Sequence, residues 1–162
     1  MVNAEKLPFE TGEFDLVLCL EVLEHAEKPW LLAKEIERVV KSNGYILVSS
    51  QQNFPIHTHP SDYFRYTPFG LSSLFNKLKS KIVFTIDIPF GNKVKLNPEH
   101  VVLIGRKTAN KNWVKGVKRF LKINEKQISV HKPYRHRLLR MYQLIREIFW
   151  ETGNHLRVVF FE

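Results

Sequence analysis

The chain has 162 residues, of which 44% are hydrophobic, and a formal net charge of +9 at pH 7. This length is enough for one globular domain with a hydrophobic core. No run of about 18 apolar residues could span a membrane, no basic-then-apolar N-terminal pattern indicates secretion, and the single Cys19 excludes an internal disulfide. A cytoplasmic protein is therefore expected.

The first predicted elements form a strand–helix–strand unit. Residues 14–20 (FDLVLCL) are apolar except for one acid, which is typical of a strand covered on both faces. Residues 26–44 predict a helix, with Pro29 in its first turn and Gly44 at its end. "YILVSS" at 45–50 predicts a second strand. The unit has the length that a right-handed parallel crossover needs.

A loop, a short helix and two strands are expected next. Residues 51–68 are polar, aromatic and proline-bearing, and they predict a loop after a strand end, where open α/β sheets bind ligands. Leucines and a phenylalanine at helical spacing predict a helix within 68–78. Two strands follow, within 81–90 and 100–107, and their separation is compatible with an antiparallel pair.

The excess positive charge lies in the last third of the chain. Residues 1–105 contain 11 Lys and Arg and 12 Asp and Glu, a net charge of −1, whereas residues 106–162 contain 14 and 4, a net charge of +10. We therefore predict a near-neutral domain over residues 1–107 and a basic helical extension over residues 108–162.

The basic extension is expected to contain two helices, at 112–123 and 134–151. The closing "HLRVVFFE" at 155–162 fits either a strand or a buried chain end. Basic helices with interleaved aromatic residues suit an anionic membrane surface or nucleic acid. The alternative is that their apolar faces pack on the domain while the arginines face water.

The order of these segments resembles a known family. Residues 3–25 (NAEKLPFETGEFDLVLCLEVLEH) join a Leu-Pro-Phe turn to an apolar strand, and residues 27–50 add a helix, a turn and a strand. Residues 57–75 (HTHPSDYFRYTPFGLSSLF) and the later strand pair follow. In this order, residues 3–107 resemble the class I S-adenosylmethionine-dependent methyltransferases, specifically the type 11-like branch of small-molecule and sugar-pathway enzymes.

The resemblance implies an α/β fold: the C-terminal half of a Rossmann-like methyltransferase sheet, with family strand order 4-5-7-6. It also implies S-adenosylmethionine as cofactor. The family's glycine-rich first strand and the ribose-binding acid after its second strand have no counterpart in this sequence. This predicts a truncated domain that lacks a strand, helix, strand, helix and strand, at least roughly 60 residues if each strand–helix–strand unit takes about 30. Residues 14–20 would then form an exposed sheet edge. This edge would be completed by an upstream region, by a partner or second copy, or by the tail folding back.

The resemblance also assigns cofactor-binding residues. Asn3 and Ala4 occupy the positions that contact adenine, although they could equally be a solvated N-terminal stub. The positions that face the methionine part of the cofactor are Cys19, Leu20 and Glu21. Cys19 is most simply a small buried hydrophobe, and Glu21 either faces solvent or lines the site. His25 matches a histidine of the branch, for which we expect an orienting or packing role.

The loop after the second strand holds the predicted acceptor side. The expected catalytic residues, which would remove or position a proton, are His57, His59 and Asp62. The expected substrate-binding residues are Tyr63, Arg65 and Tyr66. A local salt bridge between Asp62 and Arg65 is the alternative reading. Two histidines two residues apart on a loop are a weak metal signal, so no metal is expected.

Together these features predict S-adenosylmethionine-dependent methyl transfer to a small-molecule or glycan-related acceptor, weak or inactive in this chain alone. The alternative is a non-catalytic methyltransferase remnant that binds through its basic tail to an anionic membrane surface, with nucleic acid less favoured.

Overall fold

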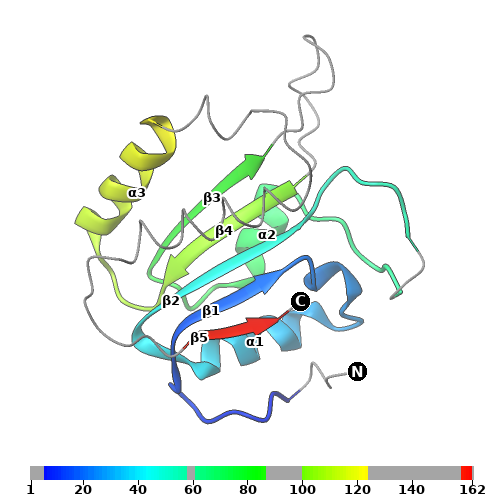
Figure 1. The fold of residues 1–162 in the computed structure, drawn as a ribbon, viewed down its shortest axis with the longest axis horizontal. Coiled ribbons are helices and arrows are strands. Elements are labelled where there is room, and N and C mark those ends of the chain that lie inside the picture. The colour runs from blue at the N-terminus through cyan, green and yellow to red at the C-terminus, as the bar shows by residue number, and fades with distance from the viewer. Residues whose placement is uncertain (1–5, 58–60, 87–99, 124–157, 162) are drawn as a thin grey trace.

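The computed structural model describes residues 6–57, 61–86, 100–123 and 158–161. Its centre is a mixed five-stranded sheet with the order β3-β4-β2-β1-β5 (Figure 1). The strands are β1 (Phe14–Leu20), β2 (Val40–Gln51), β3 (Ser80–Ile86), β4 (His100–Arg106) and β5 (Val158–Phe161). The helices are η1, a 3-10 turn (Leu23–His25), α1 (Pro29–Val39), α2 (Pro68–Leu74) and α3 (Lys111–Ile123).

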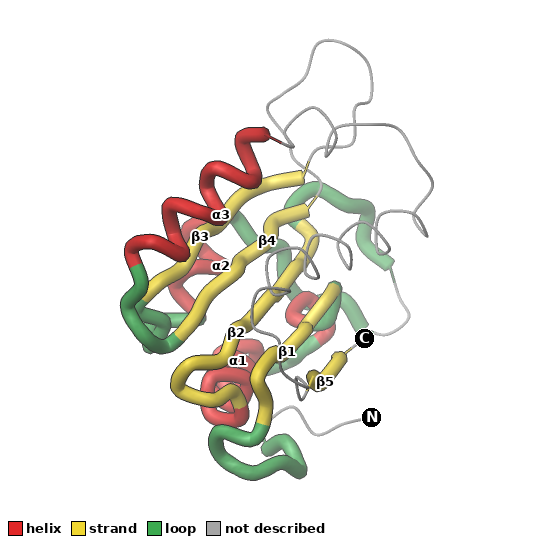
Figure 2. The backbone as a smooth tube through the Cα atoms, turned by 60° about the vertical axis from the view of Figure 1, so that its left-hand side comes forward, coloured by secondary structure: helices red, strands yellow, loops and turns green. Residues whose placement is uncertain are grey.

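Helices cover both faces of the sheet (Figure 2). On one face, α1 and α2 pack on a cluster that includes Val17, Cys19 and Ile46. On the other face, α3 packs on a cluster that includes Leu16 and Leu18. Successive residues of a strand point to opposite faces, so β1 must be apolar throughout when both faces are covered. This explains why residues 14–20 read as a continuous apolar run.

The predicted strand–helix–strand unit is confirmed, because β1 and β2 pair in parallel with α1 between them. The prediction that Gly44 ends the helix is wrong. The helix ends at Val39, and Val40 pairs with Phe14 at the start of β2. A Cβ on Gly44 would lie 2.9 Å from the Asp15 carbonyl oxygen, so this glycine serves a close approach of β2 to β1 instead.

The adjacency of the four central strands is also as predicted. β2 pairs antiparallel with β4, and β4 pairs antiparallel with β3, which gives the order β1-β2-β4-β3. The family numbers assigned to these strands stay a prediction. The predicted helix at 68–78 is shorter, because α2 ends at Leu74, while Phe75 and Leu78 remain buried against the same face.

The fifth strand comes from the C-terminal segment. β5 pairs in parallel with β1, from Leu16 opposite Val158 to Cys19 opposite Phe161. The closing residues thus form a strand and cover the β1 edge, which is the third of the predicted ways to complete it. The helix predicted at 134–151 lies outside the described residues, and the division at residue 107 stays a prediction.

One side of α1 is less solvated than its sequence suggests. We expect Glu35, Glu37 and Arg38 on a solvated face, but Glu37 is buried and accepts a hydrogen bond from the Lys77 amide at 2.9 Å. Arg38 donates to the carbonyl oxygens of Leu7 and Phe9, and Glu35 accepts from the Leu7 amide. These side chains hold the segment ahead of β1, a tertiary contact that helical periodicity does not reveal.

Among the described helices, none has the length and apolar character required to cross a bilayer.

Candidate functional site

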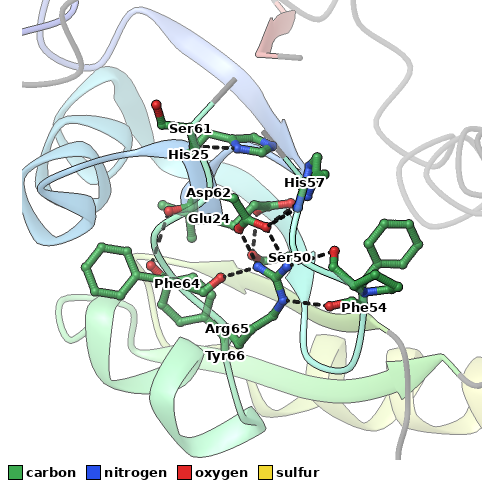
Figure 3. A network of polar contacts seen from close by, with 12 residues as sticks. Glu24, His25, Ser50, Phe54, His57, Ser61, Asp62, Phe64, Arg65 and Tyr66 are labelled. Atoms are coloured by element: carbon green, nitrogen blue, oxygen red, sulfur yellow. Dashed lines mark hydrogen bonds and ion pairs between the residues drawn. The ribbon is translucent and has the colours of Figure 1, made fainter. Parts of the chain in front are cut away.

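The candidate site lies where the parallel strands β1 and β2 end. Their carboxyl ends meet at one edge of the sheet, since Leu20 pairs with Ser49. The chain leaves β1 into η1 and leaves β2 into the loop that returns toward α2. Figure 3 shows side chains from η1, β2 and this loop converging on one polar network. In open α/β sheets this edge is where ligands bind.

Glu21 is the residue after β1. Its backbone φ is 55°, a left-handed value that residues other than glycine rarely adopt. Its Oε1 accepts from Ser49 Oγ at 2.5 Å, and its Oε2 lies 3.2 Å from His100 Nδ1. Its backbone amide donates to the Ser49 carbonyl oxygen at 3.1 Å. Left-handed backbone in a non-glycine residue costs of order 1 kcal/mol and is held by surrounding contacts, and here those contacts come from β2 and β4.

Glu24 lies one turn further on, in η1, and is fully buried. Its Oε2 accepts from Ser50 Oγ at 2.6 Å, but its Oε1 has no hydrogen-bond donor among the described residues. Burial first, and then the charge of Glu21, raise the pKa of Glu24 to about 7, against the opposing effect of Ser50. At pH 7 the Glu24 carboxyl is therefore about half protonated.

Asp62 and Arg65 form the salt bridge that we weighed as the alternative to a functional role. Both Asp62 oxygens accept from the Arg65 guanidinium. Arg65 also donates to the carbonyl oxygens of Phe54, Pro55 and Phe64, so its donors hold the loop. The hydrogen bonds from Arg65 keep the pKa of Asp62 far below its usual range. The geometry favours a loop-holding role for both residues over catalysis or substrate binding.

His57 and His25 lie side by side above this salt bridge. His57 Nδ1 is 2.9 Å from Asp62 Oδ2, and the imidazole side chain is 31% exposed. His25 Nδ1 donates to the Ser61 carbonyl oxygen at 2.9 Å. The His25 and His57 rings pack edge to face, with their centroids 4.8 Å apart. His25 thus anchors the loop, and the His57 imidazole stays partly exposed. The role expected of His25 toward the cofactor stays a prediction.

The other predicted residues differ in burial, and three of them lie outside the described residues. Tyr66 is buried, its hydroxyl donates to the Leu23 carbonyl oxygen, and burial raises its pKa, so it packs in the core instead of lining a substrate site. Tyr63 is half exposed. Cys19 and Leu20 are buried, and burial raises the pKa of the Cys19 thiol, consistent with a small core residue. The remaining three, which lie outside the described residues, are Asn3, Ala4 and His59.

Sequence reasoning missed four polar residues of the site: Ser49, Ser50, Gln51 and His100. Gln51 is buried and its Oε1 has no donor among the described residues. Ser49 and Ser50 are polar residues at the end of an otherwise apolar strand, and this pattern could have marked them as site residues. His100 gave none, because only the antiparallel pairing of β4 with β2 brings it opposite Gln51.

No group of three or more His, Cys, Asp or Glu side chains with a metal-binding arrangement is found within the described part of the chain.

Known proteins resemble this chain in sequence and in fold. A family model described as "Methyltransferase domain" matches residues 1–48. Ubiquinone biosynthesis O-methyltransferases of Pseudomonas paraeruginosa and Pseudomonas aeruginosa are 38% identical over 52 residues, which is 32% of this chain and 21% of each relative. A SAM-dependent methyltransferase from Thermotoga maritima superposes with a TM-score of 0.51 at 18% identity, over 65% of this chain and 61% of its own. The chain thus matches about a fifth of the length of these curated relatives.

Proposed function

We propose that this chain is part of a class I S-adenosylmethionine-dependent methyltransferase domain and takes part in methyl transfer to a small-molecule or glycan-related acceptor. The family match over residues 1–48 and the methyltransferase-like fold support this proposal. S-adenosylmethionine is the cofactor that the family and fold imply. The observation that carries the proposal is that the family match covers β1, α1 and most of β2, and these strands end at the polar network of Figure 3.

The residues at this edge fit the charge of the cofactor. The Oε1 atoms of Glu24 and Gln51 are buried acceptors with no donor among the described residues, and Glu21 adds a carboxylate. S-adenosylmethionine carries a positively charged sulfonium and an ammonium group with N–H donors. A site rich in acceptors and negative charge suits such a ligand. We propose that Cys19, Leu20, Glu21 and His25 form this side of the cofactor site.

The cofactor supplies an electrophilic methyl group on its sulfonium sulfur. The protein must orient the acceptor and take up the proton that a hydroxyl or amine acceptor loses. His57 is suited to this role, because it is partly exposed beside the Asp62 carboxylate. Tyr63, which is half exposed on the same loop, is suited to contact the acceptor. The name of the Pseudomonas relatives supports an oxygen acceptor.

Isothermal titration calorimetry of the whole chain tests the proposal. We expect saturable binding of S-adenosylmethionine and of S-adenosylhomocysteine, and no competition by ATP, which shares adenosine but lacks the methionine part. A chain that is folded by circular dichroism and binds neither methionine-containing ligand would refute the proposal. The acceptor class is then sought with a radiolabelled methyl donor and a panel of phenols, sugars and amines.

A second candidate function rests on α3. None of the thirteen residues of α3 is acidic. Five of its residues are exposed cations, namely Lys111, Lys115, Lys118, Arg119 and Lys122. The apolar face of the helix already packs on the sheet, so we propose electrostatic binding to an anionic membrane surface without insertion. Sedimentation with vesicles containing phosphatidylserine at two salt concentrations tests this. Unchanged binding after Lys115→Glu and Lys118→Glu would refute it.

A further inference from the structure

The His57 imidazole is held in place by residues of its own loop and of η1. Its ring packs edge to face against the rings of His25 and Phe54, with centroids 4.8 and 5.9 Å apart. Its Nδ1 lies 2.9 Å from Asp62 Oδ2, and the same oxygen accepts from the His57 backbone amide at 3.1 Å (Figure 3). These contacts restrict both the ring and the backbone of His57, so the side chain can present one nitrogen in a fixed direction.

The two nitrogens of the His57 ring lie in different surroundings. Nδ1 is buried and has no in-line hydrogen bond among the described residues, so its contact with Asp62 is electrostatic. The side chain is nonetheless 31% exposed, and this exposure lies on its other atoms, which include Nε2. A carboxylate has only acceptor oxygens, so its closeness to Nδ1 favours a proton there and leaves Nε2 unprotonated in the neutral ring.

Asp62 can impose this arrangement because its own position is fixed. Its side chain is 2% exposed, and both of its oxygens accept from the Arg65 guanidinium. Arg65 also donates to the carbonyl oxygens of Phe54 and Pro55, at 3.2 Å each. The hydrogen bonds from Arg65 keep the pKa of Asp62 far below its usual range, so this carboxylate is ionised at neutral pH. The salt bridge that holds the loop therefore also supplies a negative charge beside His57.

We propose that Asp62 is a positioning residue for His57, which keeps the proton of the neutral imidazole on Nδ1 and leaves Nε2 as the base for the acceptor. This inference rests on the proposed function and deepens it, because it names the nitrogen that acts and the residue that orients it. Hydrogen bonds of catalytic groups often align only in the ligand complex, so we expect the contact of Nδ1 with Asp62 to become in line once the acceptor binds.

His57 Nε2 takes up the proton of an acceptor hydroxyl as the acceptor oxygen bonds to the methyl carbon. The bond between that carbon and sulfur breaks, and its electron pair stays on sulfur. The imidazolium that forms lies beside the Asp62 carboxylate, whose opposite charge stabilises it, and it then loses its proton to solvent. Asp62 contacts neither the acceptor nor the methyl group in this step, so its role is one of orientation and charge.

Nitrogen-15 NMR of the histidine side chains tests the inference in the unaltered chain. Long-range proton–nitrogen correlations at pH 9, where histidine is ordinarily neutral, distinguish a protonated ring nitrogen from an unprotonated one. His57→Gln identifies the signals of this ring, because it removes them. We expect the His57 proton on Nδ1, the reverse of the preference of histidine free in water. A proton mainly on Nε2 would overturn the inference, and this measurement depends on no variant for its outcome.

Asp62→Asn shows whether Asp62 sets the tautomer. An amide in place of the carboxylate can donate to Nδ1, so we expect the His57 proton to move to Nε2 in most molecules. Asp15→Asn is the matched control, because it removes a carboxylate from the separate ion pair with Lys41 and should leave the His57 signals unchanged. An unchanged tautomer in Asp62→Asn, folded by circular dichroism, would also overturn the inference.

Calorimetric titration of the unaltered chain with S-adenosylmethionine separates this inference from the proposed function. Binding of the cofactor together with a His57 proton on Nδ1 supports both. Binding together with a proton on Nε2 would overturn the inference alone. Absence of binding would refute the proposed function, and with it the role of His57 as base, whichever nitrogen carries the proton.

Discussion

His100 Nδ1 lies 3.2 Å from Glu21 Oε2, although 79 residues separate the two in the sequence. The contact joins the start of β4 to the residue after β1, across the end of β2. It fixes one oxygen of a carboxylate whose other oxygen is bound by Ser49. A residue in a left-handed conformation is thereby held by contacts to two strands, at the edge of the sheet where we propose that the cofactor binds.

Glu21→Gln should lower the pKa of Glu24 from about 7 toward its ordinary value, because the charge of Glu21 is the second cause of the upward shift. Carbon-13 NMR of the Glu24 carboxyl over pH 4–9 measures the change. Ser49→Ala is the matched control, since it removes the hydrogen bond but keeps the Glu21 charge. An unaltered Glu24 midpoint in Glu21→Gln would show that burial alone sets it.

Glu24 should make the protein less stable as pH rises. Its pKa is raised in the folded protein, so the folded state binds more protons than the unfolded state between about pH 4.5 and 7. The free energy of unfolding therefore falls across this window, by about 1–3 kcal/mol from this group. Urea unfolding at pH 5, 6, 7 and 8 tests the slope.

Glu24→Gln should remove that part of the pH dependence, because the amide has no proton to lose in the window. Glu37 also has a raised pKa from burial, so some slope should remain in the variant. Parallel slopes for the variant and the unaltered chain would contradict the assignment to Glu24.

Arg65→Ala should destabilise the protein by about 2–3 kcal/mol, because it leaves the Asp62 side chain, which is 2% exposed, as a buried charge without its main partner. The loop over residues 51–67 should also become a preferred site of limited proteolysis. Lys41→Ala is the control. The Lys41–Asp15 pair is 43% and 27% exposed, and its loss should cost under about 1 kcal/mol. Equal losses in the two variants would contradict the loop-holding role.

Removal of residues 158–162 should expose the β1 edge and increase self-association, because an apolar strand with unpaired backbone groups recruits another chain. Size-exclusion chromatography with light scattering measures the mass as a function of concentration. Val159→Asp, in a side chain that packs against the core, should act in the same direction, and Val159→Ile should not. Monomers of unchanged stability after truncation would show that β5 does not protect this edge.

Local patterns were sufficient for most of the central fold. The apolar run at 14–20, the helical spacing around Leu32 and Ile36, and the strands near Val48 and Leu103 each reflect burial against immediate neighbours. Boundaries were less certain, as with Gly44. The helix α1 ends at Val39 because Val40 is extended and pairs with Phe14 of β1, a tertiary contact that the glycine does not indicate.

The roles that the sequence assigns to residues of the candidate site stay predictions. His57, Asp62 and Arg65 form one group. Arg65 donates its hydrogen bonds to Asp62 and to the loop backbone, which sequence spacing does not predict. Tyr66 turns inward for the same kind of reason, since its hydroxyl finds the Leu23 carbonyl oxygen 43 residues away.

The sequence by itself determined a parallel β1–α1–β2 unit, the antiparallel pair beside it and the resemblance to methyltransferases, because these depend on side-chain periodicity and on the order of segments. Only the tertiary structure decided that β5 lies against β1, that His100 reaches Glu21, and that Glu24 is buried with one oxygen that has no donor among the described residues. Those features arise from residues far apart in the chain, and their burial and charge are defined only once the sheet has brought them together.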